Sequence, residues 1–158
     1  MLTVNHVPTG AVIGLIARRH PWAAFGAGVL SHLALDAIPH WGITEPTPPE
    51  RFLYVARRDG IAGLAMAASL LLLAPRQARP ALSLAMLGAA SPDLDLVTQH
   101  FFKRSIWPHC FRKLHSDIQK DSTIQMHQEL TRAATGFTVA AAAIVVARIL
   151  KESTTSYS

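Results

Sequence analysis

The stretch that decides the fold is residues 31–41, Ser-His-Leu-Ala-Leu-Asp-Ala-Ile-Pro-His-Trp. Within it His32, Asp36 and His40 follow one another at intervals of four residues in an otherwise apolar segment. Side chains four positions apart share one face of an α-helix, so we expect His32 and Asp36 to point in the same direction. Pro39 disfavours the helical conformation of the residue before it, which places His40 in the turn after the helix, where it could still fold back over the same site.

This spacing has two interpretations. Histidine and aspartate on one helical face can bind a metal ion. They can also be a hydrogen-bonded pair inside a helix that simply stops at residues 39–42, because short motifs also occur by chance. Other motifs in the chain are needed to choose between a metal site and a hydrogen-bonded pair.

The composition of the 158-residue chain favours a membrane environment. Half of the residues are hydrophobic, only 16% are charged and the mean hydropathy is +0.25, whereas an ordinary globular domain is about 25% charged. Glycine recurs inside the apolar runs, which suits helices that pack closely in lipid. Several runs are shorter than the roughly 20 residues that span a bilayer as a helix, so an alanine-rich soluble core is an alternative. The apolar runs are residues 7–17, 22–38, 60–74, 81–90 and 133–150.

We therefore predict an all-α fold: a single domain over residues 1–158, built as a bundle of about five helices that is integral to the membrane. Residues 96–132 are polar and of mixed charge, and we expect short surface helices there. We expect Asp59 to be the N-cap of the helix that ends near Pro75. No positively charged stretch precedes the first apolar run, so we expect no cleaved signal peptide.

The charge pattern argues against a nucleic-acid-binding protein, and the cysteine content excludes an internal disulfide framework and a multi-cysteine zinc site. The formal net charge is +5, but Lys and Arg occur mostly as short pairs between the predicted helices. Because no predicted helix carries a basic stripe that could follow phosphates, we expect membrane lipids and no nucleic acid as partners. Cys110 is the single cysteine, so a metal ion would have to be bound by histidines and carboxylates.

The candidate ligands gather at one end of such a bundle. If the helices run alternately up and down, the histidines and aspartates before, between and after them fall at the same end, and ionisable residues in a membrane are functional candidates. Imidazole with carboxylate suits zinc, with manganese or iron as further candidates. A carboxylate or histidine that is not needed as a ligand could move a proton. The candidate metal ligands are His6, His32, Asp36, His40, Asp93, Asp95 and His115.

Three of these motifs together resemble a known family. The sequences Ser31-His32-Leu-Ala-Leu-Asp36, Pro92-Asp93-Leu-Asp95 and Arg112-Lys-Leu-His115-Ser116 are similar to motifs of the membrane-bound metal-dependent hydrolases of bacterial inner membranes. Asn5-His6 followed by Gly10 is similar to the start of that family's first helix. The resemblance implies a helical, multi-pass membrane protein with a metal ion, expected to be zinc. It implies ligands drawn from His6, His32, Asp36, Asp93, Asp95 and His115, with Asp36, Asp95 and His115 as the candidate catalytic residues.

The function expected from the sequence is hydrolysis of an ester or phosphoester, in a small molecule or a lipid, by a metal-dependent enzyme in the membrane. Two other hypotheses stay open. The chain could be a non-catalytic multi-pass membrane protein in which the same residues form a structural metal site or a polar cluster. It could also be a soluble, all-helical zinc enzyme of the phospholipase C type, because several apolar runs are short.

Overall fold

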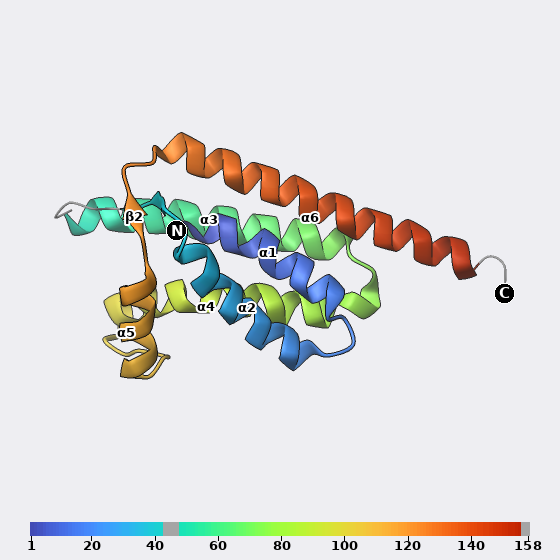
Figure 1. Cartoon of the computed structure of the whole chain (residues 1–158), viewed down its shortest axis with the longest axis horizontal. Coiled ribbons are helices and arrows are strands. Elements are labelled where there is room, and N and C mark those ends of the chain that lie inside the picture. The colour runs from blue at the N-terminus through green and yellow to red at the C-terminus, as the bar shows by residue number, and fades with distance from the viewer. Residues whose placement is uncertain (43–47, 156–158) are drawn as a thin grey trace.

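The computed structural model describes residues 1–42 and 48–155, and they are almost entirely helical (Figure 1). A 3-10 turn, η1 (Arg76–Ala78), joins two of the helices. Two very short strands, β1 (His40–Trp41) and β2 (Asp121–Ser122), pair in parallel. The predicted all-α fold is confirmed. The helices are α1 (Thr3–Ile16), α2 (Pro21–Asp36), α3 (Pro49–Leu73), α4 (Arg79–Phe102), α5 (His109–Ile118) and α6 (Met126–Thr155).

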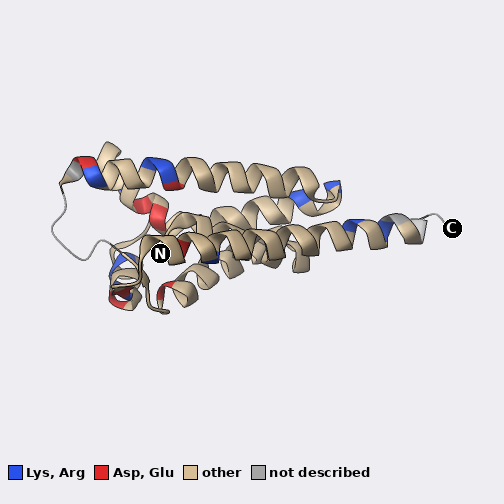
Figure 2. Ribbon diagram, turned by 90° about the horizontal axis from the view of Figure 1, so that it is seen from above, with Lys and Arg blue, Asp and Glu red and all other residues tan. Residues whose placement is uncertain are grey.

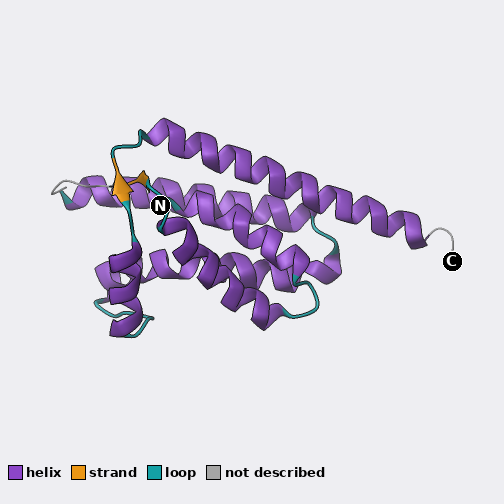
Figure 3. Cartoon of the chain, viewed as in Figure 1, coloured by secondary structure: helices purple, strands orange, loops and turns teal. Residues whose placement is uncertain are grey.

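Helix α1 lies at the centre of the bundle and contacts α2, α3, α4 and α6 (Figures 1 and 3). Glycines permit the closest of these contacts. A Cβ atom at Gly10 of α1 would lie 2.8 Å from the carbonyl oxygen of Ala85 on α4, a distance that packed atoms do not tolerate. Gly28 of α2 lies against the same turn of α4. Small residues therefore bring the backbones of α1, α2 and α4 together. The core beside them contains Val7, Ala11, Leu70, Leu82, Met86 and Ile144.

Helix α4 is longer than the sequence predicts. We expected it to run from Ala81 to about Ala90 and to stop before Pro92, whereas it begins at Arg79 and continues to Phe102. Proline has no N–H group, so Pro92 leaves the carbonyl of Gly88 without its helical donor. The hydroxyl of Ser91 donates to that carbonyl at 2.9 Å. This side-chain hydrogen bond compensates for the proline and lets the helix pass through it.

Asp59 is also placed differently from our expectation. Helix α3 begins at Pro49, so Asp59 lies inside this helix and does not begin it. Its carboxylate accepts hydrogen bonds from the backbone N–H groups of Thr3 at 2.8 Å and Val4 at 3.1 Å. These are N–H groups of the first turn of α1, which have no partner within their own helix. Asp59 therefore caps α1 from a neighbouring helix.

One helix qualifies as a membrane span. Within residues 1–42 and 48–155, only the segment Met126–Lys151 is both long enough and apolar enough to cross a bilayer, and little of it is buried against the bundle. Charged residues gather toward the two ends of the bundle and leave its middle uncharged (Figure 2). The structure thus gives one candidate span, and the multi-pass arrangement stays a prediction.

Candidate metal centre

Four of the predicted ligands meet at one end of the bundle. His32 and Asp36 come from the last two turns of α2, Asp93 from α4 and His115 from α5. Each offers a nitrogen or oxygen atom, and these four atoms all lie within 4.8 Å of one another. His32, Asp36 and His115 are buried, and the side chain of Asp93 is 18% exposed. The cluster is therefore closed on most sides and reaches the surface at Asp93.

Asp36 lies at the centre of these contacts. Its Oδ2 atom is 2.8 Å from Nε2 of His115 and 3.1 Å from Nε2 of His32, and the two imidazole nitrogens are 3.0 Å apart. Burial opposes ionisation of Asp36, but the hydrogen bonds from His115 and His32 outweigh it and hold the pKa of this carboxyl well below its usual range. Asp36 is therefore a carboxylate, the form that binds a metal ion.

The backbone of α4 fixes the tautomer of His32. Nδ1 of His32 lies 2.6 Å from the carbonyl oxygen of Ala89. A carbonyl oxygen can only accept a hydrogen bond, so Nδ1 carries a proton. The Nε2 atom of His32 faces the oxygens of Asp36 at 3.1 Å and Asp93 at 3.7 Å, and it is an acceptor in the neutral imidazole and a donor in the imidazolium. Acceptors that face one another in a buried site require a cation between them, either a proton or a metal ion.

His6 extends the cluster from α1. Its ring stacks on the ring of His32, with centroids 3.9 Å apart, and its Nε2 atom is 3.3 Å from Oδ1 of Asp36. His6 is fully buried, yet neither of its ring nitrogens has a hydrogen-bond partner. Buried polar atoms are almost always paired. The unpaired nitrogens therefore make His6 a candidate for a further ligand. The amino group of Met1 also reaches this oxygen of Asp36, at 3.0 Å.

Asp95 lies outside the cluster, although the sequence suggested it as a ligand and a catalytic residue. Its carboxylate accepts hydrogen bonds from the hydroxyl of Ser105 at 2.6 Å, from the amides of Ile106 at 2.6 Å and Trp107 at 3.2 Å, and from the side chain of Gln99 at 2.6 Å. Burial opposes its ionisation, but these hydrogen bonds outweigh it and lower the pKa of Asp95. Asp95 thus fixes the connection that leads from α4 to α5, the helix that carries His115.

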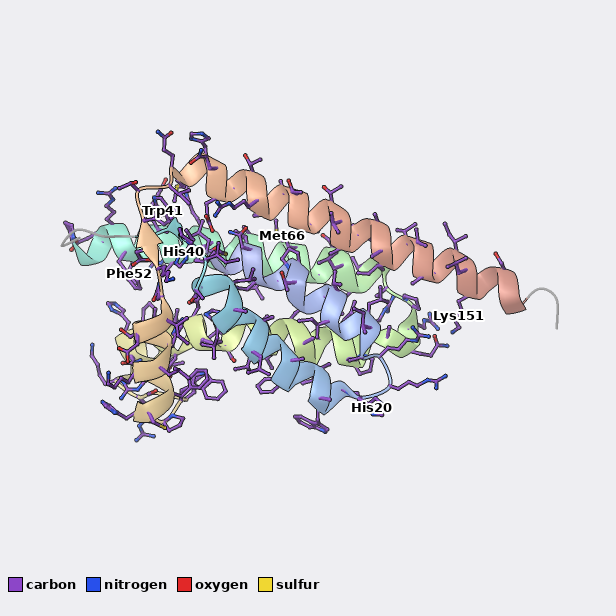
Figure 4. The ribbon with its side chains drawn as sticks, in the orientation of Figure 1. His20, His40, Trp41, Phe52, Met66 and Lys151 are labelled. Carbon is purple, nitrogen blue, oxygen red and sulfur yellow. The ribbon has the colours of Figure 1, made fainter. Side chains whose placement is uncertain are left out.

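His40 is also kept apart from the cluster. It lies with Trp41 and Phe52 at the end of the bundle that holds the N-terminus, opposite His20 and Lys151 (Figure 4). Its Nδ1 atom is 2.8 Å from the carbonyl oxygen of Ile38, and its Nε2 atom is 3.2 Å from Asp121. His40 is buried; its contact with Asp121 joins the two paired strands, and its contact with Ile38 joins β1 to the segment that follows α2. The structure does not bring this residue among the four clustered ligands.

Two contacts of the cluster carry no signal in the sequence. The carbonyl of Ala89 has no side-chain signature, although it orients His32. Thr3 donates a hydrogen bond from its hydroxyl to Oδ2 of Asp93 at 3.3 Å. This contact joins residues 90 positions apart, which only the folded chain brings together. Both groups lie behind the ligands and fix their orientation.

Comparison of the chain with protein-family models, with curated proteins and with solved structures finds no match.

Proposed function

We propose that this protein is a metal-dependent hydrolase of the membrane that cleaves an ester or a phosphoester. The observation that carries the proposal is the nearly closed cluster in which atoms of His32, Asp36, Asp93 and His115 lie within 4.8 Å of one another. The family resemblance of the three motifs supports the same conclusion and adds the bacterial inner membrane as the expected location. The geometry of the cluster supports a metal site independently of that resemblance.

The donor set fits a transition metal. His32, His115, Asp36 and Asp93 would hold the ion, and His6 is a candidate fifth ligand. Two imidazoles and two carboxylates suit zinc, with manganese or iron as alternatives, whereas calcium prefers a shell of oxygens. A bound ion of this kind acts as a Lewis acid on a carbonyl or phosphoryl oxygen and lowers the pKa of water.

The residues of the cluster differ in what they can do. Asp36 is fully buried and contacts three histidines, which suits a ligand. Asp93 is partly exposed, so it is the carboxylate that a substrate can reach. Asp93 therefore marks the side of the cluster from which a substrate would approach the ion. Thr3 holds this carboxylate in place through its hydroxyl.

The surface supports a position in the membrane. Helices α1 and α3 contact α6, so they would lie in the same apolar layer as the candidate span. Large apolar side chains point outward from several helices. The cluster lies toward one end of the bundle, where a substrate could enter from the lipid headgroup region. We therefore extend the proposal to a multi-pass arrangement. The exposed residues include Trp22, Leu30, Ile61, Leu64, Leu72, Val139 and Leu150.

A second function follows from the burial of the cluster. Its members join α1, α2, α4 and α5, and all but Asp93 are nearly inaccessible. A metal ion there could serve only to hold these helices together, because structural sites are closed to solvent. In that case the ion would contribute to folding and no substrate would be hydrolysed.

Metal analysis of the detergent-purified protein tests the proposal. We expect about one equivalent of zinc in the native chain and its loss in His32→Ala and Asp93→Asn. His109→Ala is the matched control, because His109 is an exposed histidine on the same helix as His115. Hydrolysis of p-nitrophenyl esters and bis-p-nitrophenyl phosphate is measured on the same samples. Zinc without hydrolysis would favour the structural function, and absence of metal from the native chain would refute both. Full stability without detergent would favour the soluble alternative.

A further inference from the structure

A large cavity lies between α1, α3 and α4, beside the candidate metal centre. Its volume is about 830 Å³, within the range of about 300–1,000 Å³ that is usual for ligand sites. Its walls are mostly apolar. They include Val7 of α1, Val55, Leu64 and Leu71 of α3, and Met86 and Leu87 of α4.

Three polar groups of the cavity gather beside the metal cluster. Asp93, the exposed member of the metal cluster, lines it, and so do Thr3 and Asp59. Leu71 lines it too, and the twelve residues from Asp59 to Leu71 correspond to about 18 Å of helix. The cavity therefore has a charged region beside the metal cluster, from which an apolar stretch runs along α3 toward Leu71. Such a shape fits a molecule with one polar head and a long apolar tail.

The surroundings of the cavity also favour a lipid. Helices α3 and α4 make few contacts with each other, so the cavity separates them along much of their length. Leu64 of α3 and Leu87 of α4 line the cavity and are also exposed. In a bilayer, a lipid could therefore enter between these two helices without leaving the apolar layer. A small polar substrate would gain nothing from such walls.

We propose that this cavity binds the acyl chain of a membrane lipid and places the ester or phosphoester of that lipid at Asp93. This inference rests on the proposed hydrolase and names its substrate class. The bond that is cleaved lies beside Asp93, and the chain occupies the apolar part between α3 and α4. The acyl chain thus positions the substrate, and the metal cluster supplies the chemistry.

Gly60 offers a precise test of the cavity. It lines the cavity on α3, and a Cβ atom added there would meet no atom within 4 Å. A leucine at this position would therefore add bulk beside the cavity without a clash at its Cβ atom. Gly26 on α2 has the same open surroundings, is exposed and is not among the residues that line the cavity. Gly60→Leu and Gly26→Leu thus make the same chemical change inside and outside the cavity.

The experiment uses photolabelling in nanodiscs. The probe is a phosphatidylglycerol whose palmitoyl chain carries a diazirine near its methyl end, and the labelled peptides are identified by mass spectrometry. We expect labels near Leu71, Met86 and Leu87, apolar wall residues that lie about two turns or more from Asp59 and Asp93 along α3 and α4. We expect Gly60→Leu to lower this labelling about tenfold and Gly26→Leu to leave it unchanged. Ala56→Phe, at another lining position of α3, replaces Gly60→Leu if that variant does not fold.

The outcomes separate this inference from the proposed function. Labels spread evenly over the exposed faces of α3 and α6, and unchanged in Gly60→Leu and Ala56→Phe, would overturn the lipid site. Zinc and hydrolysis are measured on the same preparations. Cavity labelling in a protein that binds no zinc would support the lipid site and refute the hydrolase. Hydrolysis without cavity labelling would refute the lipid site alone.

Discussion

Nδ1 of His32 lies 2.6 Å from the carbonyl oxygen of Ala89, so the backbone of α4 determines which nitrogen of this histidine carries the proton. The other nitrogen is turned toward Asp36 and Asp93. This arrangement places a positive charge between His32 and the two carboxylates, supplied either by a proton on Nε2 or by a metal ion.

Removal of metal should destabilise the protein. A ligand that binds only the folded state adds about 2.7 kcal/mol when its free concentration is 100 times its Kd. For a chain of this size that corresponds to roughly 5–10 °C in Tm. We expect a chelator to lower the Tm by this amount and added zinc to restore it, as measured by thermal unfolding in detergent. His32→Ala should show no response to either, and an equal response in native protein and variant would contradict the site.

Asp95→Asn should weaken the protein in a pH-dependent way. The folded pKa of Asp95 lies below the ordinary aspartate value of about 3.9, so its contribution to stability is complete above that value and is lost as the pH falls through the folded pKa. We expect the variant to lose about 1–2 kcal/mol at neutral pH. Chemical unfolding at neutral pH and at about pH 3 measures the difference, which should shrink at the lower pH. A difference independent of pH would show that the charge of Asp95 contributes nothing.

Asp59→Ala should destabilise α1. The substitution removes both acceptors of the Thr3 and Val4 amides, and loss of a cap costs about 0.5–2 kcal/mol. Asp117→Ala is the control, because Asp117 forms an exposed ion pair with Lys113, and such pairs contribute little. We expect Asp59→Ala to lower the Tm by roughly 2–6 °C and Asp117→Ala to leave it nearly unchanged, as measured by thermal unfolding. Equal Tm values for the two variants would refute the capping role.

Two glycines of α2 should respond in opposite ways to alanine. A Cβ atom at Gly28 would lie 2.9 Å from the backbone nitrogen of Ala89, whereas one at Gly26 would meet nothing within 4 Å. We expect Gly28→Ala to cost about 1–3 kcal/mol or more, because α2 and α4 must move apart. Gly26→Ala should add up to about 1 kcal/mol through its higher helix propensity. Unfolding curves of the two variants decide this, and a stable Gly28→Ala variant would contradict the close contact.

The part of the site that the sequence predicts is the part that depends on local periodicity. His32 and Asp36 are one helical turn apart, and the structure places their Nε2 and Oδ2 atoms 3.1 Å from each other. Asp93 and His115 were found through motifs, and the fold brings them to the same point. Spacing cannot show which of two neighbouring aspartates faces inward. Asp95 shares a motif with Asp93, but backbone amides of residues 106 and 107 engage it.

The sequence predicted the helical fold correctly, but it misplaced the ends of two helices, because those ends also depend on contacts that local patterns do not show. Apolar runs indicate helices, but their ends depend on contacts that are distant in sequence or on single side chains. Pro92 appeared to end α4, and the hydroxyl of Ser91 allows the helix to continue. Asp59 appeared to begin α3, and it serves the start of α1. The hydroxyl of Ser91 and the carboxylate of Asp59 are polar groups, and a hydropathy pattern does not show which partners they bind.

The contact of Gly28 with α4 has a consequence for recognising relatives of this chain. Gly28 precedes His32 by one helical turn on the same face, and it lets α2 approach α4 closely enough for the imidazole to reach Ala89. A residue without a side chain therefore determines the protonation of a ligand. A homologue that keeps this chemistry should carry the pattern Gly-x-x-x-His-x-x-x-Asp, and a bulky residue at its first position would mark a protein in which the histidine has lost that role.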